Sequence, residues 1–119
     1  MYSIKVEANF SSAHNLRGYK GKCEELHGHN WKIELAITKN KLDKLGMVAD
    51  FRLVKDRLNM VLEKLDHKYL NNIPYFKKVN PTSENIAKYI YDCLKRQVPG
   101  VKSVTVWESE NSSATYYNE

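Results

Sequence analysis

Apolar and polar residues alternate in two stretches of the chain. Between residues 2 and 10 the even positions are apolar, and between residues 30 and 38 the odd positions are apolar. Because side chains two residues apart share one face of a strand, each stretch predicts a β-strand with one buried face. Residues 11–26, which include Gly18 and Gly21, separate these strands and are predicted to form a loop.

Two later stretches repeat apolar residues at intervals of three and four, the spacing of one helix face. Asp50 is suited to cap the first helix, which we expect to end near Asp66. Thr82 is suited to cap the second, after a loop through residues 72–74. Residues 101–108 and 114–117 predict two further strands. The order β-β-α-α-β-β predicts an α+β fold, a four-stranded antiparallel sheet with two helices on one face.

The length of 119 residues predicts one domain over residues 1–119, small enough for oligomerisation to aid its stability. No apolar run is long enough to span a membrane, and the alternating N-terminus is unlike a signal peptide. We therefore expect a cytoplasmic protein that does not bind membranes. Its two cysteines, Cys23 and Cys93, could form at most one bridge and are interpreted as free thiols.

The chain is basic, with 19 Lys+Arg against 14 Asp+Glu and a formal net charge of +5. Such a charge could serve nucleic acid, an acidic surface or a phosphorylated small molecule. The basic residues form no dense run, and no aromatic-rich nucleic-acid motif lies among them, so no nucleic-acid partner is predicted. Charge alone leaves the partner open.

Three of the four histidines lie close together in the sequence, as His14, His27 and His29. His27 and His29 are two residues apart at the start of the second strand, so both rings can share one face. His14 continues the even phase of the first strand and can reach the same end of the sheet. Three neutral imidazoles suit zinc and leave a fourth position for water or substrate. The alternative is that the histidines are unrelated, but their clustering favours a metal site.

Cys23 lies four residues before His27 and allows two interpretations. As a fourth ligand it would close the site and make the zinc structural. As a free thiolate beside a cation and next to Lys22, it would have a lowered pKa and act as a base. We favour the base, because Cys23 belongs to a polar loop where packing explains little.

The residues just described are part of a longer set of motifs. The motifs are Cys23-Glu24-Glu25-Leu26-His27-Gly28-His29 with His14 upstream, Met47-Val48-Ala49-Asp50-Phe51, Leu65-Asp66-His67-Lys68-Tyr69-Leu70-Asn71, Pro81-Thr82-Ser83-Glu84-Asn85, and Glu108. Together these motifs resemble the 6-pyruvoyltetrahydropterin synthase superfamily. The resemblance spans nearly the whole chain. The three-residue gap between the cysteine and His-Gly-His is similar to that of the 6-carboxytetrahydropterin synthases of queuosine biosynthesis.

The resemblance implies roles for the motif residues that agree with the metal site predicted above. It implies that the three clustered histidines hold Zn²⁺ and that Cys23 is catalytic. It also implies that Asp66 and His67 form a proton relay, in which Asp66 holds the tautomer of its neighbour. The alternative for His67 is a helix C-cap.

For substrate binding, the resemblance implies that Glu108 anchors the pterin, with further contacts from Thr82, Ser83 and Glu84. Glu108 continues the apolar face of residues 104 and 106, where an unpaired charge is costly. A carboxylate there can accept two adjacent N–H groups of a pterin. The alternative is a structural salt bridge.

The implied reaction is the conversion of 7,8-dihydroneopterin triphosphate to 6-carboxy-5,6,7,8-tetrahydropterin, acetaldehyde and triphosphate. The implied architecture is the tunnelling fold, usually a hexamer with sites between subunits. Three alternatives stay open. One is a pyruvoyl-forming synthase, and another is release of the whole side chain to give 6-hydroxymethyl-7,8-dihydropterin for folate, for which Glu24 is suggestive. The third is a non-enzymatic, zinc-stabilised binding module.

Overall fold

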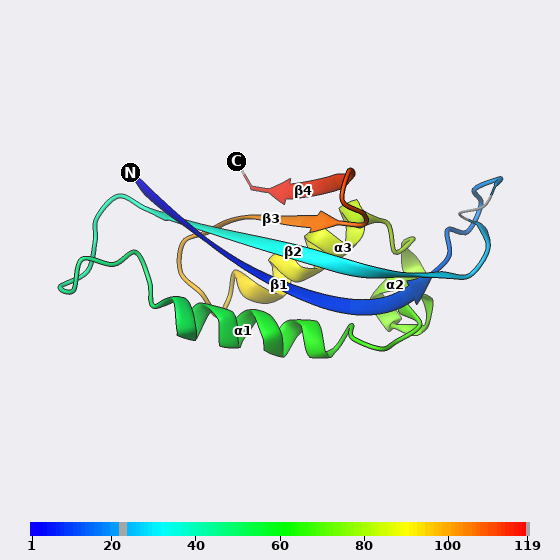
Figure 1. Cartoon of the computed structure of the whole chain (residues 1–119), viewed down its shortest axis with the longest axis horizontal. Helices are drawn as coiled ribbons and strands as arrows, with labels where there is room; N and C mark the ends of the chain where they lie inside the picture. Colours follow the sequence, from blue (N-terminus) through cyan, green and yellow to red (C-terminus); the bar gives the residue numbers. More distant parts are fainter. Residues whose placement is uncertain (22–23, 119) are drawn as a thin grey trace.

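The computed structural model describes residues 1–21 and 24–118. Its four strands are β1 (Tyr2–His14), β2 (His27–Lys39), β3 (Val101–Trp107) and β4 (Ser113–Tyr117). They form one sheet in the order β1-β2-β3-β4, with every neighbouring pair antiparallel (Figure 1). The predicted α+β fold with a four-stranded antiparallel sheet is confirmed.

Strands β1 and β2 are longer than the alternation pattern predicted, and this places the histidines. The pairing of β1 with β2 continues to a last pair formed by His14 and His27. The predicted loop of residues 11–26 is therefore wrong at its start, because β1 continues to His14 through polar residues that the hydrophobic pattern does not mark, whereas its end is confirmed, since β2 begins at His27. The described parts of the connection from β1 to β2, residues 15–21 and 24–26, lie at one end of the elongated molecule (Figure 1).

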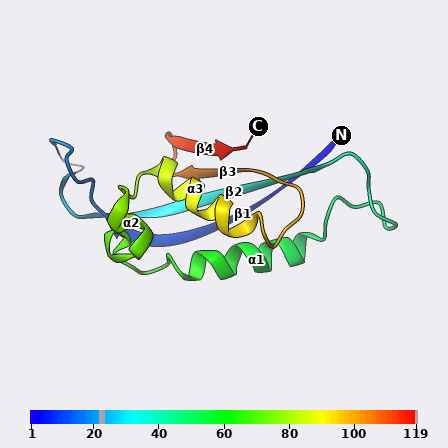
Figure 2. The same ribbon diagram turned by 180° about the vertical axis from the view of Figure 1, so that it is seen from behind.

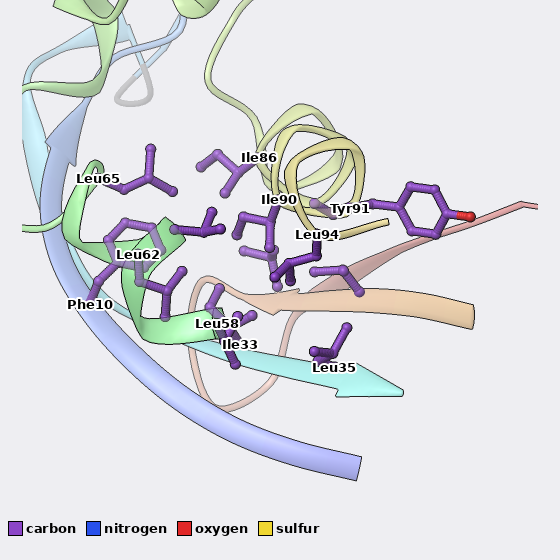
Figure 3. Packing of buried hydrophobic residues seen from close by; sticks show 14 of the residues in the cluster. Phe10, Ile33, Leu35, Leu58, Leu62, Leu65, Ile86, Ile90, Tyr91 and Leu94 are labelled. Atoms are coloured by element: carbon purple, nitrogen blue, oxygen red, sulfur yellow. The ribbon is translucent and has the colours of Figure 1, made fainter. Parts of the chain in front are cut away.

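The two long helices are α1 (Phe51–Glu63) and α3 (Ser83–Leu94), and both lie on the same face of the sheet (Figure 2). The predicted caps are confirmed, because the Asp50 side chain accepts from Arg52 N–H and the Thr82 side chain accepts from Asn85 N–H. Helix α1 ends at Glu63, slightly before the predicted end. The core fills the space between the helices and the inner face of the sheet (Figure 3).

The connection from α1 to α3 contains two short elements that the sequence pattern did not predict. They are the 3₁₀ helix η2 (Leu70–Asn72) and the helix α2 (Pro74–Lys78), which has proline in its first turn. Both are too short to show a helical repeat, so the prediction of a plain loop there was wrong. Buried Leu70 and Phe76 attach this connection to the core. No helix in residues 1–21 and 24–118 is long and apolar enough to cross a membrane.

Candidate metal centre

Three imidazoles meet at the end of the sheet where β1 and β2 stop pairing. His14 and His27 are opposite each other on the two strands, and their Nε2 atoms are 3.0 Å apart. His29 is two residues further along β2 on the same face, with its ring centre 5.2 Å from that of His14. The structure therefore brings together all three histidines that the sequence singled out.

Backbone carbonyl groups accept hydrogen bonds from the Nδ1 atoms of two of these rings, His14 and His27. His14 Nδ1 lies 2.7 Å from the Pro81 carbonyl oxygen, and His27 Nδ1 lies 2.8 Å from that of Glu25. A carbonyl only accepts hydrogen bonds, so each Nδ1 is the protonated nitrogen and each Nε2 keeps a free lone pair. This is the usual arrangement around metal-binding histidines, in which an outer partner fixes the tautomer.

The centre is partly withdrawn from water. His14 is 2% exposed, and Trp31 packs in edge-to-face geometry against the rings of His14 and His29. Burial lowers the pKa of His14, and the Pro81 carbonyl opposes this shift only partly. Burial likewise lowers the pKa of His29, against the opposing charge of Glu108. Both imidazoles are therefore neutral near pH 7, the form that binds a metal ion.

The carboxylate of Glu108, just after β3, joins the histidines. Glu108 Oε1 lies 2.8 Å from His29 Nε2 and 3.8 Å from His14 Nε2. The closer pair is at ion-pair distance but lacks hydrogen-bond geometry, so the buried His29 Nε2 has no hydrogen-bond partner among the described residues. The Ser83 hydroxyl donates to the other oxygen, Oε2, at 3.4 Å.

These four residues fit a metal ion. One donor atom from each of His14, His27, His29 and Glu108 lies within 4.8 Å of the others. Tetrahedral coordination with Zn–N bonds of about 2.0–2.1 Å puts ligand nitrogens about 3.3 Å apart, close to the spacing of the His14 and His27 nitrogens. The buried His29 Nε2, which has no hydrogen-bond partner among the described residues, lies beside a carboxylate, an arrangement that a bound cation would satisfy.

Asp66 and His67 lie outside this cluster, beside the outer edge of β1. Asp66 Oδ1 accepts from Ser11 N–H at 2.9 Å, and Asp66 Oδ2 lies 3.0 Å from His67 Nδ1. The Ser11 hydrogen bond, followed by the His67 contact, lowers the pKa of Asp66. The predicted Asp-His pair therefore exists in the structure, and the His67 side chain is 82% exposed.

The backbone of His67 adopts an unusual conformation for a residue with a side chain. Its φ is +54°, in the left-handed region. His67 N–H donates to the Ser11 carbonyl, and Ala13 N–H donates to the Lys68 carbonyl, so the segment is held against β1. His67 and His29 line the same shallow hollow at this edge. Non-glycine residues in this region concentrate at functional sites, because other contacts must offset the strain.

The remaining predicted site residues have varied surroundings. Cys23 lies outside the described residues. Glu24 and Glu84 are exposed. The Thr82 hydroxyl is occupied as the cap of α3, whereas Ser83 is buried next to Glu108. Of the predicted pterin contacts, the structure places only Ser83 and Glu108 in contact with each other.

Sequence reasoning missed the carbonyls of Pro81 and Glu25 and the presence of Glu108 within the histidine cluster. Every residue carries a carbonyl, so the first two leave no signal in the sequence. The strand phase did place Glu108 on the inner face, but only the closeness of the β3 end to β2 brings its carboxylate to His29.

A family model described as 6-pyruvoyl tetrahydropterin synthase matches residues 3–119. The chain belongs to the 6-pyruvoyl tetrahydropterin synthase family. This confirms the resemblance stated on the motifs, and the fold is the tunnelling-type α+β fold of that family.

Individual relatives in the 6-pyruvoyl tetrahydropterin synthase family match along nearly the whole chain. A protein of Synechocystis sp. named 6-carboxy-5,6,7,8-tetrahydropterin synthase is 38% identical over 124 residues, which cover 99% of this chain and 95% of the relative. A Haemophilus influenzae protein of the same name is 29% identical over 139 residues, 98% and 99% of the two chains. The solved structure of Caenorhabditis elegans 6-pyruvoyl tetrahydropterin synthase superposes with a TM-score of 0.90 at 29% identity, covering 99% and 96%.

Proposed function

We propose that this protein is a zinc-dependent lyase that converts 7,8-dihydroneopterin triphosphate to 6-carboxy-5,6,7,8-tetrahydropterin, acetaldehyde and triphosphate. Atom balance requires one water molecule in addition to the substrate. The observation that carries the proposal is the four-donor cluster of three histidines and Glu108, in a chain whose full-length relatives include proteins named 6-carboxy-5,6,7,8-tetrahydropterin synthase.

His14, His27 and His29 would hold the zinc ion through their Nε2 atoms. The Nδ1 contacts to Pro81 and Glu25 support this role, because they fix two rings in the ligand tautomer. When bound, zinc supplies Lewis acidity that makes side-chain hydroxyls of the substrate more acidic. The protein orients that side chain and keeps water away from the buried His14 side of the centre.

Proton transfer would be divided between two groups. The Cys23 thiolate removes a proton from the substrate side chain, and the His67 imidazole returns one, which ends in carbon–carbon cleavage. The contact of Asp66 with His67 Nδ1 supports this role, since it orients the ring and stabilises its charged form.

Glu108 would anchor the pterin by accepting two adjacent N–H groups side by side. The Ser83 hydroxyl on Oε2 supports this role because it orients the carboxylate. Thr82 and Glu84, at the same end of α3, would complete the pterin pocket. Glu108 Oε1 also lies within reach of the metal position, and a Glu108→Gln variant tests whether this carboxylate is a ligand in addition.

The active form would be a cytoplasmic homo-oligomer, a hexamer of single-domain chains acting in queuosine biosynthesis. The edge strands β1 and β4 support assembly, because joining them to neighbouring copies removes unpaired sheet edges. The exposed His67 supports a site shared between subunits, in which one copy supplies the histidine cluster and a neighbour supplies His67. Neither nucleic acid nor a membrane is needed as a partner.

The direct test is incubation of the zinc-loaded protein with 7,8-dihydroneopterin triphosphate and mass analysis of the products. The proposal predicts the carboxylated pterin and acetaldehyde. A pyruvoyl product would indicate the pyruvoyl-forming synthase instead. A 6-hydroxymethyl product would indicate complete side-chain release and would direct attention to Glu24.

A Cys23→Ala variant separates an enzyme from a zinc-stabilised binding module. The enzyme proposal predicts retained zinc and lost turnover. A closed structural site predicts weaker zinc binding and a less stable fold. Cys93→Ala is the matched control, because Cys93 lies on α3 and packs against the core. This variant should retain both zinc and turnover.

A further inference from the structure

The pairing of β1 with β2 ends at His14 and His27, and the buried side-chain amide of Asn71 binds the backbone of the next residue. The next residue, Asn15, has no strand opposite it on β2. Instead, Asn15 N–H donates to Asn71 Oδ1 at 3.0 Å, and Asn71 Nδ2 donates to the Asn15 carbonyl at 2.9 Å. One side chain thus satisfies both backbone groups of the residue that follows a metal ligand.

Asn71 is suited to this position because it carries an acceptor and a donor side by side. Its side chain belongs to η2 and is 7% exposed, so an unmade hydrogen bond there would be costly. Aspartate has the same shape but lacks the donor, and it would place a negative charge against the Asn15 carbonyl. The position therefore distinguishes two side chains of equal size.

The Asn15 side chain extends the connection to the loop that follows. Its Oδ1 accepts a hydrogen bond from the Tyr69 hydroxyl, and its Nδ2 donates to the Glu24 carbonyl at 3.3 Å. Glu24 directly follows Cys23 in the sequence. A continuous series of hydrogen bonds thus runs from η2 through Asn15 to the residue next to the cysteine.

We propose that Asn71 is a positioning residue that holds Asn15 and, through Asn15, the backbone at Glu24, the residue that follows Cys23 in the sequence. The inference rests on the proposed function, in which Cys23 is the base. The metal ligand His14 is also held by its pairing with His27 and by the Pro81 carbonyl, so loss of Asn71 should leave the metal in place. The effect should fall on the rate of the chemical step.

The test compares Asn71→Asp with Asn72→Asp in the full-length, zinc-loaded protein. Asn72 is the adjacent residue, is exposed, and undergoes the same change of charge. For Asn71→Asp we expect one zinc per chain, a KM within about threefold of wild type and a kcat lowered about tenfold, as expected for one lost hydrogen bond. For Asn72→Asp we expect kcat within about twofold.

A second measurement does not depend on turnover. In a Cys93→Ala background, iodoacetamide alkylates Cys23 alone, and we expect its rate to change at least about fivefold in Asn71→Asp but not in Asn72→Asp, again the size of one hydrogen bond. If wild type makes no carboxylated pterin, the proposed function fails, but this comparison still decides whether Asn71 positions the loop.

A purely structural role makes a different prediction. It would lower the melting temperature of Asn71→Asp and leave kcat per zinc-loaded chain and the alkylation rate unchanged, which would overturn the inference. If Asn71→Asp does not fold, Asn15→Asp replaces it, because this change keeps the backbone bonds to Asn71 and removes only the donor to Glu24. The same fall in kcat is expected, and an unchanged kcat would overturn the inference.

Discussion

If the histidine cluster binds zinc as proposed, removal of its most buried imidazole should abolish most of the stabilisation expected from the bound ion. His14 is 2% exposed and donates one of the four candidate ligand atoms, so His14→Ala leaves three donors. A ligand that binds only the native state stabilises it by about 2.7 kcal/mol at 100 times its dissociation constant. For a chain of this size, about 1 kcal/mol corresponds to about 4 °C, so wild type should gain about 10 °C.

The melting temperature of the His14→Ala variant should rise much less than that of wild type at the same zinc concentration. Changes to outer partners of a metal site already weaken binding by about 10–100-fold, so we take a loss of at least about 100-fold for a ligand. Zinc is then near its dissociation constant, and the stabilisation falls to about 0.4 kcal/mol, or about 2 °C. The assay is thermal unfolding at fixed protein concentration, with chelator and with buffered zinc.

Each variant is compared with its own metal-free form, because His14→Ala also removes the hydrogen bond to Pro81 and costs the apoprotein about 1–3 kcal/mol. His67→Asn is the matched control, since it removes an imidazole outside the cluster and asparagine tolerates the φ of +54°. His67→Asn should show the full zinc-dependent rise in melting temperature. A full shift in His14→Ala, or a lost shift in His67→Asn, would refute the assignment of the metal centre.

Three further outcomes follow from the same geometry. Burial lowers the pKa of His14 and of His29, so the unfolded chain binds protons at a higher pH than the folded chain does. The free energy of unfolding of the apoprotein, measured with urea, should therefore decrease as the pH falls below about 6.5, and these two groups should not change it above that pH. Glu108→Gln should keep zinc but raise KM for the pterin at least about tenfold, the effect of one lost charged hydrogen bond, and loss of zinc instead would make Glu108 a ligand. Leu58→Ala, at a fully buried position of α1, should cost about 2–5 kcal/mol in urea unfolding with zinc affinity unchanged.

Periodicity in the sequence was enough to predict which faces of the strands and helices are buried. The alternation from residue 2 onward has the period of a strand, and the apolar repeat after Asp50 has the period of a helix. Both periods follow from local backbone geometry, so they can be recognised without knowledge of the rest of the fold. The same phase put the rings of His14, His27 and His29 on one face, because strand phase extends to any residue that the strand includes. The motif resemblance then identified the family, which the family match confirms.

The surroundings of those histidines could not be predicted in this way, because they depend on how remote segments pack together. The Pro81 carbonyl reaches His14 and the Asn71 amide reaches Asn15 across more than fifty residues of chain, and Glu108 meets His29 because β3 pairs with β2. Such contacts depend on the path of the chain, and a carbonyl oxygen has no residue identity that a pattern could reveal. Periodicity records which side of an element is buried, whereas the partner that buries it is set by the packing of remote segments.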